Sequence, residues 1–98
     1  MILEMHPEAR LEFREAIAYY ESCREGLGLE FSREIYASIN RIADLPMLWS
    51  KLTINSRRFL TKRFPYSIIY QALDDSILIV AVAHQSRKPG YWKDRLRR

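Results

Sequence analysis

The sequence predicts one α+β domain spanning residues 1–98, in which a helical hairpin packs on one face of a small, mainly antiparallel sheet. Three observations give this prediction. Two stretches of the first half repeat apolar residues at helical spacing, and the second half turns to β-branched and aromatic residues. One late apolar run has the composition of a strand that is buried on both faces. The expected order of elements is β-α-α-β-β-β.

The first half contains the expected first strand and both helices. Residues 1–5 are mostly apolar, and Pro7 suits the first position of a helix. Apolar residues then recur at helical spacing, namely Ala9, Phe13, Ile17 and Tyr20. Gly26 and Gly28 interrupt this pattern, and a second stripe follows, made of Phe31, Ile35, Ile39, Ile42 and Leu45. Pro46 ends it, because proline disfavours helical geometry in the preceding residue. Two helices of this kind predict an antiparallel hairpin joined by a glycine-containing turn.

The second half has the composition of a small sheet. Residues 46–56 are predicted to form a connecting loop, and 58–63 a strand. Residues 66–73 are rich in β-forming side chains. Asp74-Asp75-Ser76 predicts a turn, because Asp bonds its own backbone in tight turns. The apolar residues 77–83 then return as an antiparallel, fully buried strand.

Composition excludes several classes of protein. The longest apolar run is about seven residues, against the roughly 20 that a membrane-spanning helix needs. The N-terminus shows no basic region followed by an apolar stretch, so no secretory signal is expected. Cys23 is alone, which rules out an internal disulfide and fits a reducing cytoplasm. Because no metal-ligand spacing and no phosphate-binding loop are present, we expect a cytoplasmic protein without metal or cofactor.

Charge is distributed very unevenly along the chain. Residues 1–49 contain nine acidic and five basic residues, a formal charge of −4. Residues 50–98 contain three acidic and eleven basic residues, a formal charge of +8. Such asymmetry predicts a positive face that attracts an anionic partner, either nucleic acid or an acidic protein segment.

The predicted topology concentrates this charge. Lys62 and Arg63 end one expected strand, and Arg87 and Lys88 follow the last one. Since 66–73 and 77–83 are hairpin partners, their outer ends should meet at one edge of the sheet, and the four bases with them. Candidate binding residues at this edge are Lys62, Arg63, Arg87, Lys88, Tyr91, Trp92 and Arg95, which offer guanidinium forks for anions and aromatic rings for stacking.

The C-terminal pattern also resembles a known group of proteins. An apolar strand is followed by His84-x-x-Arg87-x-Pro89-x-Tyr91-Trp92-x-x-Arg95. This resembles the RelE/ParE superfamily of small bacterial toxins from type II toxin-antitoxin modules, and above all the ParE-type branch often labelled plasmid stabilisation proteins. The resemblance implies the same element order, a toxin that inhibits growth, and a small acidic antitoxin that forms a complex with it.

Two mechanisms follow from the resemblance. ParE-type relatives poison DNA gyrase and imply no nuclease site, so that Arg87, Tyr91, Trp92 and Arg95 are target contacts or fold anchors. The tail pattern favours this branch. A third hypothesis is a non-toxic remnant or a simple nucleic-acid-binding module with the same basic edge.

RelE-type relatives are instead ribosome-dependent mRNA endonucleases. That branch implies catalytic roles for Arg63 and Arg87 as phosphate-binding residues, Tyr91 as a stacking or orienting group and His84 in proton transfer. The sequence leaves open whether the protein is an enzyme, and whether His84 and Trp92 are functional or structural. A structural histidine satisfied by backbone is the alternative for His84, and an anchor packed on the sheet is the alternative for Trp92.

Overall fold

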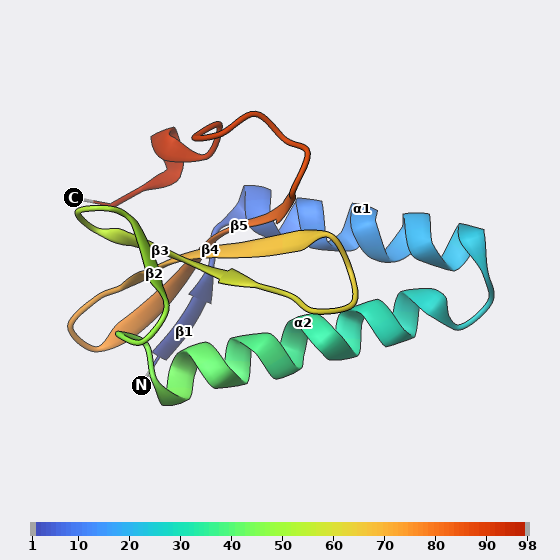
Figure 1. Ribbon diagram of the computed structural model, residues 1–98, viewed down its shortest axis with the longest axis horizontal. Coiled ribbons are helices and arrows are strands. Elements are labelled where there is room, and N and C mark those ends of the chain that lie inside the picture. Colours follow the sequence, from blue (N-terminus) through green and yellow to red (C-terminus); the bar gives the residue numbers. More distant parts are fainter. Residues whose placement is uncertain (1, 98) are drawn as a thin grey trace.

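The computed structural model describes residues 2–97, which form a mixed sheet with helices on one face and the C-terminal segment on the other (Figure 1). The helices are α1 (Pro7–Cys23) and α2 (Leu27–Asp44), with one 3₁₀ turn, η1 (Lys93–Arg95). The strands are β1 (Ile2–Met5), β2 (Ser50–Thr53), β3 (Ser56–Leu60), β4 (Tyr66–Ala72) and β5 (Ser76–His84). Their order in the sheet is β1-β5-β4-β3-β2. The α+β class and the helical hairpin are as predicted.

Strand β5 organises the sheet because it pairs on both sides. It is antiparallel to β4 and parallel to β1, with Met5 opposite Ile79. All seven of its inner residues, 77–83, are buried, as the apolar run predicts. Beyond Ile79, β1 no longer accompanies β5, so the rest of this edge must find other hydrogen-bond partners.

The hairpin of α1 and α2 is closed by local interactions. His6 caps α1, because its Nδ1 accepts a hydrogen bond of 3.1 Å from the amide of Glu8. Gly26 begins α2 in the left-handed region, at a φ of 87°. A Cβ on Gly28 would lie 2.7 Å from the carbonyl oxygen of Ile17. The two helices therefore approach too closely at this point for any larger residue.

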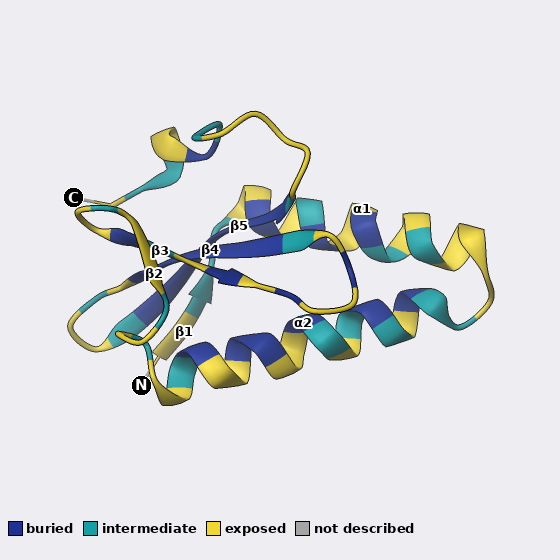
Figure 2. Ribbon diagram, in the orientation of Figure 1, coloured by how far each residue is buried: buried dark blue, intermediate teal, exposed yellow. Residues whose placement is uncertain are grey.

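The main core lies between the helical hairpin and the sheet (Figure 2). Both predicted stripes face inward except for Leu45, which follows the last residue of α2 and is 57% exposed. The aromatic members of the stripes pack with rings from the sheet side. Phe31 lies 5.1 Å from Phe64 and 4.9 Å from Tyr66, measured between ring centroids. The buried members of this core include Ala9, Phe13, Phe31, Ile35, Ile39, Ile42, Phe59, Phe64, Ile68, Tyr70, Ile77, Ile79 and Val82.

A second, smaller core covers the other face of the sheet. The C-terminal tail, which we define as residues 85–97, crosses back over this face and ends beside the β2–β3 turn (Figure 1). There the side chain of Asn55 donates a hydrogen bond to the carbonyl of Arg97. Trp92 packs with Ile69, Leu78, Val80, Ala81 and Ala83, and only 6% of it is exposed. Of the two predicted alternatives for Trp92, the structure shows the buried anchor.

Two predicted boundaries were wrong. Residues 46–56 are not simply a loop, because they contain β2 and the first residue of β3. Strand β2 has no period-two apolar pattern, since it is an exposed edge strand held by pairing with β3 alone. Strand β3 also ends at Leu60 rather than at Arg63, because the amides of Lys62 and Arg63 both bond the carboxylate of Glu34 on α2 instead of a strand.

No helix within residues 2–97 is long and apolar enough to cross a membrane.

Replacing Trp92 by Ala should destabilise the protein by about 3–5 kcal/mol, the usual cost of removing a buried large side chain. Chemical denaturation measures this change. Lys93→Ala, at the exposed neighbour, is the control and should change stability by less than about 0.5 kcal/mol. A Trp92→Ala variant as stable as the control would show that the tail is not part of the folded core.

Candidate functional site

The site predicted from sequence lies where β5 ends and the tail begins. His84 pairs with Tyr66 across the β4–β5 hairpin, and their rings meet edge to face with centroids 5.2 Å apart. His84 Nδ1 accepts a hydrogen bond of 3.0 Å from the amide of Ser86. An amide can donate only to an unprotonated nitrogen, so in the neutral ring the proton is on Nε2. Nδ1 is therefore occupied by Ser86, and Nε2 is the ring nitrogen that faces other partners.

Arg87 is the cation that this region presents most openly. Its guanidinium lies over the ring of Tyr91, 3.9 Å from the ring centroid, and its side chain is 52% exposed. Glu12 on α1 is the nearest carboxylate, at 4.0 Å. Stacking on the ring orients the guanidinium while leaving it available to a partner.

Tyr91 and Arg95 are both tied to Glu12. The Tyr91 hydroxyl donates to Glu12 Oε2 at 2.7 Å, and the Arg95 guanidinium bonds both carboxylate oxygens, at 3.0 and 3.1 Å. Burial, followed by the hydrogen bond to Glu12, raises the pKa of the Tyr91 phenol above its ordinary value of 10.0. Tyr91 is therefore a neutral donor and Arg95 a nearly buried fold anchor. We call Glu12, Tyr91 and Arg95 the Glu12 clasp.

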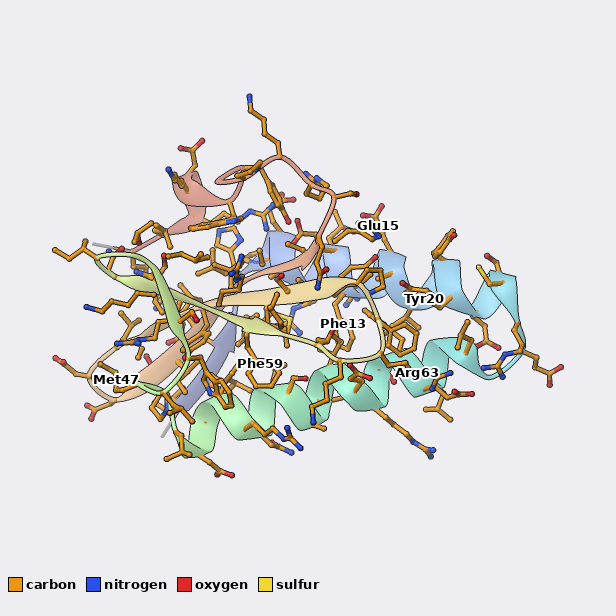
Figure 3. All side chains as sticks on the ribbon, viewed as in Figure 1. Phe13, Glu15, Tyr20, Met47, Phe59 and Arg63 are labelled. Atoms are coloured by element: carbon orange, nitrogen blue, oxygen red, sulfur yellow. The ribbon has the colours of Figure 1, made fainter. Side chains whose placement is uncertain are left out.

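Lys62 and Arg63 reach the same end of the sheet but face elsewhere. The amide of Gln85 donates to the carbonyl of Pro65, so the β3–β4 turn and the start of the tail are adjacent. Arg63, however, pairs with Glu30 on α2 and lies over the ring of Phe64, on the helical side of the sheet (Figure 3). The four predicted bases therefore share an edge of the backbone, whereas the charged groups of Arg63 and Arg87 point to different partners.

Arg58 was missed by the sequence prediction, although it joins Arg87 and Lys88. These three cations line a hollow of about 160 Å³ on the tail side of the sheet, together with the rings of Tyr91 and Trp92. The signal was available in the strand alternation. Phe59 of β3 is buried in the helical core, so Arg58 must point to the opposite face. Lys88, one of the candidate binding residues of the sequence, lines the same hollow.

A second basic surface lies along the groove between α2 and β3. It comprises a hollow of about 350 Å³ lined by Arg33, Arg41, Phe59 and Lys62 together with the carboxylate of Glu34, which accepts the backbone amides of Lys62 and Arg63. It continues into a hollow of about 230 Å³ that adds Trp49. Within residues 2–97, none of the three cations Arg33, Arg41 and Lys62 forms an ion pair.

Trp49 gives this groove a further property. Its ring packs against Phe59, with centroids 4.6 Å apart, and its Nε1 is buried without a hydrogen-bond partner. Buried polar groups are nearly always paired, so this indole N–H is an unusual feature of the groove wall. The cations along the groove favour an acidic occupant.

The geometry supports binding more than catalysis. His84 Nδ1 is hydrogen-bonded to Ser86, the Tyr91 hydroxyl donates to Glu12, and the Arg95 guanidinium is bonded to the same carboxylate. Arg58, Arg87 and Lys88 remain as cations that can contact anionic groups of a partner.

The comparisons with known proteins agree with the resemblance seen in the sequence. A family model described as "ParE toxin of type II toxin-antitoxin system, parDE" matches residues 3–89. No curated protein matches the chain significantly. A solved structure titled "Chromosomal ParDE TA system from P. aeruginosa" matches with a TM-score of 0.72 and 15% identity, over 86% of this chain and 95% of that chain. At this identity the structural match shows the fold alone.

The raised pKa of Tyr91 predicts an unusual titration. Its phenol should ionise at a pH well above 10.0 in the folded protein. Because the folded-state pKa exceeds the unfolded one, the stabilisation is fully present below pH 10.0 and is lost as the pH rises through the folded value. Ultraviolet titration of the wild type and Tyr91→Phe isolates this phenol by difference. Ionisation at or below the value measured in denaturant would contradict the assignment.

Proposed function

Because this chain belongs to the ParE toxin family of type II toxin-antitoxin systems, we propose that it inhibits bacterial growth by poisoning DNA gyrase in the cytoplasm and is neutralised by a small acidic antitoxin. The target contact in this proposal is the tail side of the sheet, with Arg87, Lys88 and Arg58 as its charged residues. The observation that carries the proposal is the commitment of Tyr91 and Arg95 to Glu12, which leaves a cationic binding surface without an acid–base pair.

The physical case for a poison rather than a nuclease rests on proton transfer. Cleavage of RNA through the 2′-hydroxyl needs a base to remove a proton and cations to stabilise the developing charge. Arg87 and Arg58 could meet the second requirement. Of the possible bases near Arg87, Glu12 is bonded to Tyr91 and Arg95, and His84 Nδ1 is bonded to Ser86. Glu15 lines a different hollow beside Arg87, on the α1 side. A lysine could also act as the base, but Lys51 lies on the exposed edge strand β2 and does not line the hollow that contains Arg58 and Arg87.

Ribosome-dependent mRNA cleavage remains the second candidate function for one reason. The hollow brings Arg58, Arg87 and Lys88 together with His84, which is a set suited to one or two phosphate groups. A non-toxic nucleic-acid-binding remnant shares this surface and would be recognised by normal growth of cells that express abundant folded protein.

The antitoxin is proposed to occupy the groove between α2 and β3. An amphipathic acidic segment can place apolar side chains over Phe59 and Trp49, and carboxylates beside Arg33, Arg41 and Lys62. Arg33, Arg41 and Lys62 of the groove are absent from the tail-side hollow, and Arg87 and Lys88 are absent from the groove, so substitutions at these residues can alter antitoxin binding and target binding independently.

Expression without an antitoxin should stop growth, cause filamentation and leave mRNA intact if gyrase is the target. Arg87→Ala should weaken both growth arrest and inhibition of gyrase supercoiling, with a stability change below about 0.5 kcal/mol because its side chain is half exposed. Arg63→Ala is the matched control, since Arg63 pairs with Glu30 away from the hollow.

The nuclease hypothesis makes the opposite prediction for these variants. Loss of one phosphate-binding arginine should reduce the cleavage rate by roughly 10²-fold, measured on translating ribosomes with purified protein. The gyrase proposal would be contradicted if the protein cleaved ribosome-bound messages and if Arg63→Ala and Arg87→Ala lowered the cleavage rate equally without changing the melting temperature.

The antitoxin proposal predicts a salt-dependent association rate. The on-rate should fall as ionic strength rises, because exposed rim charges steer the encounter, while the apolar contacts set slow dissociation. Arg41→Ala should slow association several-fold in stopped-flow measurements at low salt. Arg14→Ala, an equal charge change on an exposed site of α1, is the control. Equal effects of both variants would place the antitoxin outside this groove.

A further inference from the structure

Glu12 accepts hydrogen bonds from several residues outside its own helix. Its carboxylate is only 13% exposed and accepts hydrogen bonds from Tyr91, from both terminal nitrogens of Arg95 and from the amide of Val82, the last at 3.1 Å. Arg87 approaches the same carboxylate to 4.0 Å. One side chain of α1 thus connects to β5 and to three residues of the tail.

The segment that presents Arg87 has few other constraints. Residues 85–89 are exposed, and their backbone hydrogen bonds are local turns plus one contact to the β3–β4 turn. The guanidinium of Arg87 is located chiefly by the Tyr91 ring beneath it, 3.9 Å away. The Tyr91 ring is in turn held in place by the hydrogen bond from its hydroxyl to Glu12 and by the neighbouring anchor residue Trp92.

We infer that Glu12 is a positioning residue for the target contact: by holding the Tyr91 hydroxyl, it keeps the ring under Arg87 and so fixes the direction in which Arg87 faces the partner. The inference rests on the proposed function, because it needs Arg87 to contact the target. Glu12 itself does not touch the partner, since it is covered by the tail.

Fixing one cation in advance has a physical consequence for binding. A free arginine side chain loses rotamer freedom when it is immobilised at an interface, and pre-organisation removes part of that cost. The stacked geometry also excludes lysine as an equivalent, because an ammonium group lacks the planar face that lies on Tyr91.

A double-mutant cycle tests the inference. Glu12→Gln should reduce gyrase inhibition and growth arrest about tenfold in the wild type, a coupling within the range found for contacting residues. The same substitution should have no further effect in an Arg87→Ala background. If Glu12 has a purely structural role, Glu12→Gln should reduce gyrase inhibition by the same factor with Arg87 and with Ala at position 87. That result would overturn the inference.

Glu12→Gln also removes the charge that pairs with the nearly buried Arg95, which can destabilise the fold. Tyr91→Phe therefore provides a milder second variant, because it removes only the hydroxyl bond to Glu12 and keeps the ring. It should stay folded and show a smaller loss of inhibition that again vanishes when Arg87 is Ala. Full inhibition by folded Tyr91→Phe and folded Glu12→Gln would overturn the inference.

Nuclear magnetic resonance separates this inference from the proposed target. The Arg87 side-chain protons should show a ring-current shift from Tyr91 in the wild type that shrinks in Glu12→Gln. An unchanged shift overturns the positioning role whatever the target is. If the wild type is toxic but leaves gyrase active, only the proposed target is refuted. Growth arrest then replaces gyrase inhibition as the quantity measured in the double-mutant cycle. Unchanged binding of the antitoxin to the groove between α2 and β3 is the control for folding.

Discussion

The fold depends on how the free edge of β5 is completed beyond the end of β1. The last pair of the parallel ladder joins Met5 to Ile79, yet β5 continues to His84. The carbonyl of Val80 and the amide of Val82 are satisfied by Arg95 and Glu12, which also bond each other. An ion pair between α1 and the tail therefore takes the place of a strand. Unpaired backbone groups at this position would be costly, because the surrounding strand is buried.

This arrangement explains why the sheet has two covered faces in so short a chain. The helical hairpin covers one face, and without the tail the apolar residues of the other face would be exposed. Trp92 and Leu96 cover them, and the tail end is fixed where the side-chain amide of Gln71 exchanges hydrogen bonds with the backbone of Arg97. Burying β5 on both faces and ordering the basic tail are thus achieved by the same contacts.

The same contacts divide the basic residues into two groups. Arg95 is used internally, as is Arg63 through Glu30, whereas Arg87, Lys88 and Arg58 stay available on the tail side. A charge of +8 on residues 50–98 is therefore larger than the charge presented at either surface. The acidic residues of the helical half account for the difference, because several of them are partners of the basic half rather than a separate acidic face.

The sequence by itself determined the class of the fold, the helical hairpin, the buried β5 and the family, because each depends on local periodicity or on a contiguous pattern of residues. It also located the basic region around Arg87 and Lys88, since hairpin pairing brings the strand ends together. The sequence did not determine edge strand β2, which has no apolar pattern, or the role of Arg58, which depends on the pleat direction of β3. Only the tertiary structure assigned Tyr91, Trp92 and Arg95 to anchoring. Glu12, the partner of Tyr91 and Arg95, lies more than seventy residues away in the sequence, and Trp92 packs on strands that are also distant from it or separated by a turn. No local rule encodes such contacts.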